Sequence, residues 1–435
     1  MTRAITIPKR ALVVLCGPSA VGKSTWSRAH FTSSQIIASD RCRQMVSDDL
    51  NWHEPLVSDV AFDFLYHWVE QRLRLNRLAV VDSTALMTGT RQHLLSLARK
   101  WHSPSALIIC NADMETCLRR DRERADSVGP RVLRRQFKLM AHERRAFSRE
   151  GWDQIIEIQM SSEQEPAVHL VPLPHERPDD EGPFDIIGDV HGCRAELGDL
   201  LLNLGWVPDE GGTPHHPEGR RLIFVGDLSC GGPDSIGVWD LALRLRDAGR
   251  AEILAGDHDV RFARLLRGEA MEVDRGLEIA AGELMNHPTA HLERITEGVQ
   301  EVVGTSPPHL LLDHERLAVT HAAIADHMIG KTGRVVRDFC RHGEGPRSPH
   351  RGDWIRRHRG IQLVVHGHTP TPVPRMRNHT LSIDTGCVLG GALTALRWPE
   401  RRLVQVQARA IHWGTGWATP ASAPQGEIPL ESAVC

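Results

Sequence analysis

The stretch from Gly17 to Thr25, GPSAVGKST, has the spacing of a phosphate-binding loop. An apolar segment precedes it and a helical one follows, so the glycines let backbone N–H groups wrap phosphate oxygens beside a helix N-terminus. Lys23 would reach the β- and γ-phosphates of ATP, and Ser24 would offer a hydroxyl to Mg²⁺. Together with Gly17, Gly22 and Thr25, these residues form the expected nucleotide site.

Two carboxylates follow apolar segments that read as strands. Asp40 ends QIIASD, and Asp82 ends LAVVD. Open α/β sheets bind ligands at the carboxyl ends of their strands. Asp40 is therefore a candidate general base for an attacking hydroxyl, with a helix N-cap as the alternative. Asp82 would hold Mg²⁺ through water or contact the acceptor.

Residues 117–150 are strongly basic, with eleven Lys or Arg against five acids. Arg120 and Arg124 are four residues apart, which predicts that they share one face of a helix. Kinases use a mobile cationic lid to neutralise the phosphoryl group in transfer. The alternative is a solvated helix pair joined by ion pairs. We favour a catalytic lid, with a basic surface for the acceptor.

A second group of carboxylates and imidazoles lies in the other half of the chain, at the ends of apolar segments. GDVHG, VGDL, AGDHD, VTHAAI and VVHGHTP supply them. Mixed Asp and His ligands without cysteine suit Mn²⁺, Fe or Zn in a two-metal hydrolytic site. Single core histidines are common, but five such clusters favour a metal centre. The candidate metal ligands are Asp189, His191, Asp227, Asp257, His321 and His368.

Elements that could position these groups follow from the apolar pattern. Over the first 160 residues, short Val/Ile/Leu runs alternate with helical stretches, which predicts a parallel sheet covered on both faces. Strands resume after a proline-containing stretch, and residues 268–308 read as a helical insertion. The expected organisation is a domain over 1–160, a linker over 161–182, a second domain over 183–412 and a flexible tail over 413–435.

The composition limits the class of protein. A chain of 435 residues is long enough for two or three domains, and a net charge of −3 gives no overall nucleic-acid or membrane signal. Nine scattered cysteines without a C-x-x-C pair indicate free thiols in a reducing compartment. No apolar run approaches a membrane span, and the N-terminal run is too short for a signal peptide. We expect a cytoplasmic protein.

The motifs FDIIGDVHGC, VGDL, GPDS, VTHAAI, HGHTP and SIDTGCVLGGALTALRWPE resemble those of a known family. They are similar to the calcineurin-like phosphatase domain of bacterial polynucleotide kinase-phosphatase, an RNA end-healing enzyme. The order of a phosphate-binding loop followed by these motifs matches too, and the resemblance covers most of residues 10–410. It implies an α/β chain: an N-terminal P-loop kinase with a parallel sheet, then a calcineurin-like metallophosphatase αββα sandwich.

The resemblance also implies an activity. It predicts an ATP·Mg²⁺-dependent 5′-hydroxyl polynucleotide kinase joined to a 3′-phosphate or 2′,3′-cyclic phosphate phosphatase with two divalent metals, Mn²⁺ foremost. Asp40 would be the kinase base, and Arg120 with Arg124 the lid arginines. His258 would protonate the leaving alcohol, and Asp384 would lie near the metals. Expected partners are RNA or DNA ends and a separate RNA ligase, since this chain stops after the phosphatase; no membrane is expected, and the oligomeric state, a homodimer included, stays open.

Three residues depart from the family pattern. Cys230 stands where an Asp would orient the histidine acid, and Gly231 stands where an Arg would clamp phosphate. Asp257 replaces an Asn ligand, and Arg194 is a candidate substitute cation. One alternative is therefore an active kinase whose phosphatase domain binds metal but turns over weakly. A second is a phosphoesterase for small nucleotides such as dinucleoside polyphosphates, or for phosphoproteins.

Overall fold

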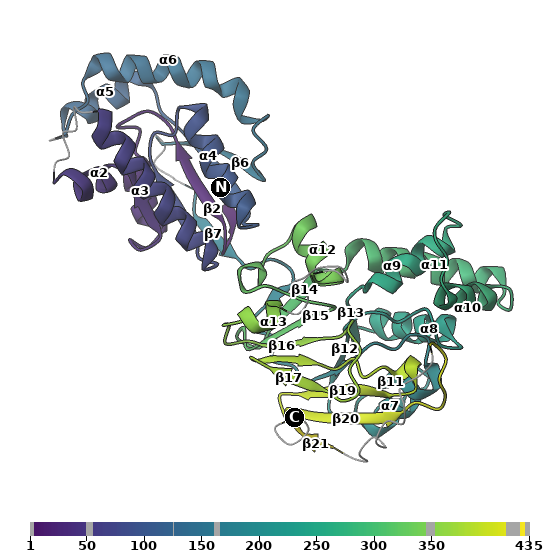
Figure 1. Cartoon of the computed structure of the whole chain (residues 1–435). Coiled ribbons are helices and arrows are strands. Elements are labelled where there is room, and N and C mark those ends of the chain that lie inside the picture. Colours follow the sequence, from purple (N-terminus) through teal and green to yellow (C-terminus); the bar gives the residue numbers. More distant parts are fainter. Residues whose placement is uncertain are drawn as a thin grey trace. The chain divides into compact units, whose positions relative to one another are not determined.

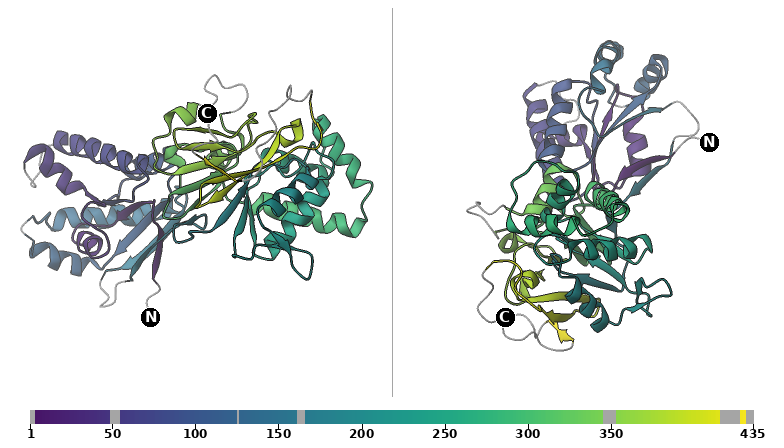
Figure 2. Two further views of the ribbon diagram at one scale, coloured as in Figure 1. Left: turned by 90° about the horizontal axis from the view of Figure 1, so that it is seen from below. Right: turned by 90° about the vertical axis from the view of Figure 1, so that its right-hand side faces the viewer.

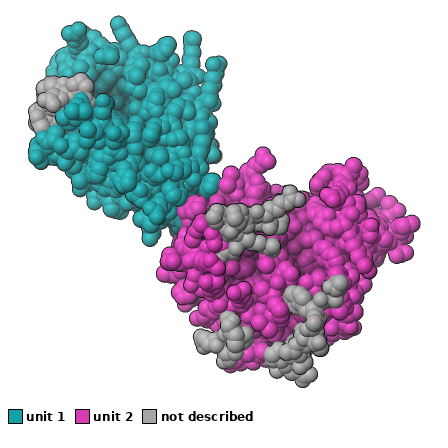
Figure 3. Space-filling model, viewed as in Figure 1, with its two compact units in different colours: residues 1–174 teal, residues 175–435 magenta. Residues whose placement is uncertain are grey.

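The structure is a computed structural model that describes residues 4–48, 55–124, 126–160, 166–344, 353–414 and 427–430. The chain forms two compact units, Met1–Pro174 and His175–Cys435, coloured separately in Figure 3. Each unit has its own hydrophobic clusters, so each is described by itself.

A five-stranded sheet forms the centre of the first unit (Figure 1). Its strands in spatial order are β3 (Ile36–Ala38), β4 (Ala79–Asp82), β2 (Leu12–Cys16), β5 (Ser105–Asn111) and β6 (Gln154–Gln159). Every neighbouring pair is parallel. The helices are α1 (Lys23–His30), α2 (Ser39–Ser47), α3 (Pro55–Arg74), α4 (Thr88–Lys100), α5 (Met114–Arg122) and α6 (Pro130–Phe147). The predicted parallel sheet is confirmed.

The central strand β2 explains why both faces of this sheet are covered. Alternate strand residues point to opposite faces. Leu12 and Val14 pack in the cluster that contains residues of α3 and α4. Val13 and Leu15 pack in a different cluster with Trp26 of α1. A continuous apolar sequence is thus what a strand buried on both sides requires.

The stretch expected to be a linker contains two short strands. β7 (Val168–Val171) pairs in parallel with β1 (Ile5–Pro8) in the first unit. β8 (Glu176–Arg177) pairs with β14 (His309–Leu312) in the second unit. Prolines and charged residues around these strands hide them in the sequence, and residues 161–165 lie outside the described part of the chain.

Two six-stranded sheets pack against each other in the second unit. One has the order β13 (Ala251–Ile253), β12 (Arg221–Phe224), β9 (Phe184–Ile187), β19 (Ala392–Trp398), β20 (Arg402–Gln407) and β21 (Ile428–Pro429). The other has the order β17 (Arg375–Arg377), β18 (Thr380–Ser382), β16 (Leu363–His366), β15 (Leu317–Thr320), β14 and β8. Apolar side chains of both sheets, such as Ile186 and Val365, form a shared cluster. This is the sandwich that the sequence predicted.

Helices cover the outer faces of this sandwich. The first sheet packs against a cluster with residues of α7 (Arg194–Asn203), α8 (Ser235–Asp247), α9 (Asp257–Leu266), α10 (Arg275–Leu284) and α11 (Thr289–Thr305). The second packs against α12 (Arg334–His342) and α13 (Asp353–Arg357). The helices of residues 235–305 gather at one side of the unit (Figure 2). Helices α10 and α11 form the predicted insertion.

Three further expectations concern the tail, the thiols and the membrane. In the predicted tail, β21 pairs with β20, while residues 415–426 and 431–435 lie outside the described part. The eight cysteines that the structure describes are all free thiols, as predicted. Among the described helices, none combines the length and the apolar character needed to cross a membrane.

Candidate functional site

The phosphate-binding loop lies between β2 and α1 in the first unit. Gly22 precedes α1 with φ +116°, and Lys23 is the first residue of the helix. Lys23 is buried, and its Nζ donates to the carbonyls of Gly17 (2.9 Å) and Pro18 (2.7 Å). A Cβ on Gly17 would lie 2.6 Å from the carbonyl oxygen of Cys110, so only glycine fits there. The loop thus has the backbone that phosphate binding requires.

Ser24 and Thr25 follow in the first turn of α1, and both are exposed. Their hydroxyls are therefore accessible to a nucleotide and its metal ion. Their roles stay predictions.

Asp40 and Asp82 follow adjacent strands of the sheet. Asp82 ends β4, and its Cα pairs with that of Ala38 at the end of β3. Ala38, not Asp40, is the N-cap of α2. Asp40 accepts a hydrogen bond from Arg43 Nη1 at 2.7 Å, and its side chain is 59% exposed. The capping alternative is therefore wrong, and the Asp40 carboxylate is accessible just past the end of β3. Its role as a general base stays a prediction.

The structure separates the two predicted lid arginines, which corrects their expected placement on one helix. Helix α5 ends at Arg122, so Arg124 lies beyond it and pairs with Asp126 at 2.7 Å. The chain turns there because the buried Asp121 carboxylate accepts hydrogen bonds from residues 127–129. Arg120 instead donates to the carbonyl of Val21 at 2.8 Å. Arg120 thus contacts the phosphate-binding loop, and Arg124 does not share its helical face.

Sequence reasoning missed a contact between α6 and the loop. Gln136 Oε1 accepts from the backbone N–H of Ser19 at 2.7 Å, and its Nε2 donates to Ser19 Oγ at 3.1 Å. This contact brings the arginine-rich helix α6 beside the phosphate-binding loop. A single glutamine in a charged helix carries no recognisable pattern.

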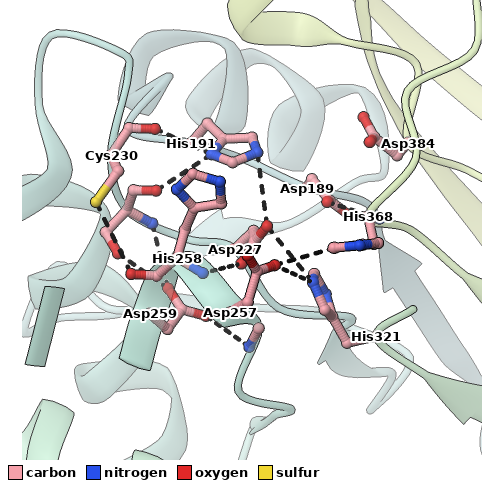
Figure 4. A network of polar contacts seen from close by, with 12 residues as sticks. Asp189, His191, Asp227, Cys230, Asp257, His258, Asp259, His321, His368 and Asp384 are labelled. Carbon is pink, nitrogen blue, oxygen red and sulfur yellow. Dashed lines mark hydrogen bonds and ion pairs between the residues drawn. The ribbon is translucent and has the colours of Figure 1, made fainter. Parts of the chain in front are cut away.

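The second candidate site collects the ends of parallel strands from both sheets of the second unit. Strands β9, β12 and β13 run parallel in one sheet, and β15 and β16 run parallel in the other. The residues just after these strands therefore converge at one end of the sandwich. In order along the chain they include Asp189, His191, Asp227, Asp257, His321 and His368 (Figure 4).

Their side chains form two groups that share Asp227. Asp189, His191 and Asp227 offer ligand atoms within 4.8 Å of one another, and so do Asp227, Asp257, His321 and His368. Asp227 lies in the middle of the labelled residues in Figure 4. Its Oδ2 lies 3.7 Å from His191 Nε2 and 3.5 Å from His321 Nε2. Asp227 could therefore serve as a ligand of two cations.

Backbone carbonyls fix the orientation of two of the imidazoles. His191 Nδ1 lies 2.9 Å from the carbonyl of Cys230, and His321 Nδ1 lies 3.1 Å from that of Val225. A carbonyl only accepts, so each Nδ1 carries the hydrogen and each Nε2 faces the carboxylates. That is the usual support of a metal-binding histidine.

Burial shifts the acidity of the carboxylates. Burial, with Asp384 nearby, raises the pKa of Asp189 well above its ordinary value. Burial, with Asp257 nearby, does the same to the pKa of Asp227. Burial alone would raise the pKa of Asp257, but the adjacent imidazoles of His321 and His368 lower it. Clustered buried acids of this kind favour a bound cation.

Three features indicate that the site fits divalent cations. Asp189 Oδ1 is buried and has no hydrogen-bond partner among the described residues. Gly256 and Gly367 leave room for the carboxylates, since a Cβ on either would overlap Asp227 Oδ1 or Asp189 Oδ1. Asp259 accepts from the backbone N–H groups of Leu228 and Gly256 and so fixes two ligand-bearing loops. The residues present could hold two such ions.

His258, the predicted acid, lacks an orienting partner. Its backbone N–H donates to Asp227 Oδ1 at 2.9 Å, but its buried Nδ1 has no partner among the described residues. The Cys230 thiol contacts the His258 backbone carbonyl at 3.8 Å rather than the ring. Burial, with the neighbouring His191, lowers the pKa of His258 to about 3. The predicted acid role stays a prediction, and Cys230 does not replace the missing Asp.

Trp413 is a site residue that no sequence motif marks. Its ring lies 5.3 Å from that of His258 and 5.9 Å from that of His191. It belongs to a segment after β20 that had been expected to be part of the tail. The candidate substitute cation, Arg194, begins α7, and its Nη1 lies against Gly198 on the next turn of that helix.

Restoring an arginine at Gly231 is expected to destabilise the second unit. Gly231 has φ +117°, and a Cβ there would lie 2.9 Å from Val388 Cγ2 and 3.1 Å from Trp413 Cε3. Backbone strain costs about 1–3 kcal/mol, and overpacking costs about 1–3 kcal/mol more. Gly333→Arg is the matched control, because Gly333 has φ +115° and open space around it. Chemical unfolding should show a larger loss for Gly231→Arg, partly reversed by Trp413→Ala; equal losses in the two single variants would contradict this.

A half-buried acid beside the same loop predicts a pH dependence of stability. Burial raises the pKa of Glu283 from 4.5 to about 7, and its Oε2 accepts from the backbone N–H of Ile236. A raised pKa contributes stability below the unfolded value that is lost as pH rises through the folded one. Glu283→Gln should therefore raise the unfolding midpoint relative to the unsubstituted chain at about pH 8 but not at about pH 5. Glu278→Gln, an exposed change on the same helix, should do neither; a pH-independent effect of Glu283→Gln would refute the explanation.

Comparisons with known proteins follow the division of the chain. Residues 12–147 match a family model described as an AAA domain. Bis(5′-nucleosyl)-tetraphosphatase PrpE (asymmetrical) of Geobacillus thermodenitrificans is 40% identical over 235 residues, 53% of this chain and 96% of that protein. The protein of the same name from Anoxybacillus flavithermus is 40% identical over 229 residues, 51% of this chain and 93% of that protein. A protein serine/threonine phosphatase from Saccharomyces cerevisiae is a 12% identical solved structure that covers 56% of this chain and 86% of its own, with TM-score 0.36.

These matches confirm the predicted pairing of a P-loop kinase-like domain with a metallophosphatase-like domain. The phosphoesterase domain is related to dinucleoside tetraphosphatases, and relatives of this kind imply the use of divalent metals. Polynucleotide specificity stays a prediction. With 96% of the first relative's length covered at 40% identity, the chain belongs to the family of bis(5′-nucleosyl)-tetraphosphatase PrpE and adds a kinase-like AAA domain.

Proposed function

We propose that the second unit hydrolyses dinucleoside polyphosphates with two divalent metal ions. The observation that carries the proposal is the pair of ligand groups sharing Asp227. Asp189 and His191 would hold one ion with Asp227, and Asp257, His321 and His368 would hold the other. Two such ions activate a water molecule and neutralise the phosphate under attack. The Asp and His donors suit Mn²⁺.

The relatives and the environment of His258 support this substrate class. Hydrolysis of a phosphoanhydride joins the water oxygen to one phosphorus, breaks the P–O–P bond and releases two nucleotides. A phosphate leaving group needs less protonation than an alcohol does. His258 Nδ1 has no partner among the described residues, and Cys230 does not reach the ring. Because His258 lacks an orienting partner in the described part of the chain, the site favours hydrolysis of an anhydride over hydrolysis of an alcohol ester.

For the first unit we propose ATP-dependent transfer of phosphate to a hydroxyl, with Lys23 and Mg²⁺ at the phosphates and Asp40 as base. The 5′-hydroxyl of a polynucleotide is the proposed acceptor. Helix α6 supports it, because Gln136 ties that helix to Ser19 of the loop. Exposed Arg134, Arg135 and Lys138 lie on the same helix, where they would attract a phosphate backbone.

RNA end healing is a second candidate for the whole chain, favoured by this basic helix. In it, the second unit would remove 3′-phosphate or 2′,3′-cyclic phosphate. One set of assays separates the candidates: diadenosine tetraphosphate, both RNA ends and a phosphopeptide with Mn²⁺, and 5′-hydroxyl RNA with ATP·Mg²⁺. Hydrolysis of the dinucleotide above all other substrates supports our proposal. Preference for RNA ends establishes the second candidate instead, and no hydrolysis of any substrate overturns both.

A further inference from the structure

A cavity of about 620 Å³ lies beside the metal ligands Asp257 and His368, wholly in the second unit. Its volume is in the range of small-molecule sites. The face of strands β16, β17 and β18 lines it on one side, and Trp354 and Ile355 of α13 line it on another. The cavity extends the candidate metal centre toward one edge of the second sheet.

Strand register sets a row of polar residues along this cavity. Arg375 pairs with Ser382 across β17 and β18, and Ser382 pairs with His366 across β18 and β16. Alternate residues of a strand share a face, so Arg377 and Thr380, the next such pair, lie on the same side. The row runs from exposed arginines at the sheet edge to buried groups near His368.

Two buried polar atoms in this row have no partner among the described residues. Ser382 is 5% exposed and His366 4%, and Ser382 Oγ and His366 Nε2 are both unpaired. His366 Nδ1 already donates to the Gly367 carbonyl at 3.2 Å, and the ring lies 5.1 Å from that of Trp354. An unpaired buried polar group costs about 1–3 kcal/mol. These atoms therefore indicate a polar ligand, and the Trp354 ring lines the same cavity.

Unpaired cations surround the mouth of the cavity. Arg356, Arg375 and Arg377 line it and are exposed, and none forms an ion pair with a residue of the described part. Arginine forks bind phosphate oxygens in pairs. These three side chains supply positive charge near a metal site whose own loop carries Gly231 in place of a cation.

We propose that this cavity binds the nucleotide portion of the substrate that lies beyond the bond to be cut, an inference that rests on the hydrolase function proposed above. Arg375 and Arg377 bind its phosphates. Ser382, His366 and Trp354 contact its nucleoside. A dinucleoside polyphosphate and an RNA end share this chemistry, so the test has an arm for each.

The binding test uses the full chain without metal, in EDTA. Lys23→Ala is present throughout to weaken nucleotide binding in the first unit, and ADP is the probe in calorimetry. Adding Arg375→Gln and Arg377→Gln should weaken ADP binding at least about tenfold, as expected for lost charged hydrogen bonds. Arg334→Gln, a change at an arginine that is 93% exposed on α12, should not. Equal affinity in all three proteins, or no ADP binding in any, overturns the proposal.

The activity test identifies the source of the nucleotide. With Mn²⁺, kcat/KM is compared for diadenosine tetraphosphate, a 3′-phosphorylated RNA trinucleotide and p-nitrophenyl phosphate. The double arginine variant should lose at least about tenfold more for one nucleotide substrate than for p-nitrophenyl phosphate. The substrate with the larger loss is the one that the cavity serves. Equal losses of kcat/KM on all three substrates overturn the proposed subsite. If the unsubstituted chain turns over none of them, only the hydrolase proposal fails, and the ADP binding test then decides the subsite.

Discussion

Replacing Asp227 by asparagine is expected to abolish hydrolysis and to weaken both metal sites together. Asp227 belongs to both ligand groups and is almost fully buried. Asparagine keeps an oxygen to accept the His258 backbone N–H, which Asp227 Oδ1 accepts at 2.9 Å, so the fold should survive. Asp227 would hold both cations, so the lost charge should weaken both sites, and turnover should fall by a factor on the order of 10³.

The matched measurements are metal content per chain and turnover of diadenosine tetraphosphate. His191→Asn, which changes a residue of one group only, should lower the metal content less than Asp227→Asn. Asp240→Asn changes a carboxylate of α8 that pairs with Arg244, and it should alter neither quantity. Full metal content and normal turnover in Asp227→Asn would show that the two groups do not share a bridging ligand.

Replacing Lys23 by alanine is expected to remove phosphoryl transfer from the first unit. Lys23 is buried in the loop, with its Nζ on two backbone carbonyls. A nucleotide would offer its phosphates to the same ammonium group. Loss of one preorganised charge at a reacting phosphate typically costs about 10²–10³ in rate.

Transfer of the γ-phosphate of ATP to a 5′-hydroxyl oligonucleotide measures this effect, and ATP binding accompanies it. Lys100→Ala, an exposed lysine paired with Glu70, is the control and should leave transfer unchanged. Hydrolysis by the second unit should be normal in both variants. Unchanged transfer and unchanged ATP binding in Lys23→Ala would show that the loop does not serve a kinase.

The clustering of the candidate metal ligands could be predicted from the sequence, because these residues lie just past the ends of the strands of this unit. Asp189, Asp227 and His321 each follow a short apolar run, and parallel neighbours end at a common edge. The phosphate-binding loop was predictable for a similar reason, since the local backbone requires its glycines. A carbonyl packs closely against Gly17, and Gly22 has a positive φ. Features that depend on local spacing could therefore be predicted from the sequence.

Features that depend on contacts between distant residues could not be predicted from the sequence. The spacing predicted that Arg124 and Arg120 share one helix face. The helix ends before Arg124, because the Asp121 carboxylate accepts hydrogen bonds from the following loop and turns the chain. Trp413 lies beside His258 because the backbone N–H groups of its segment donate to the carbonyl of Val388. The cavity beside the metals arises from strand register and from α13, neither of which leaves a motif.

The pairing of β1 with β7 bears on how this protein can be divided for study. Ile5 and Ile7 are buried in a cluster that also contacts Val168 and Leu170. Cutting the chain at residue 160, the boundary expected from sequence, would delete β7 and leave β1 as an uncovered apolar edge prone to self-association. A fragment of the first unit should therefore extend to Pro174, the last residue of that compact unit.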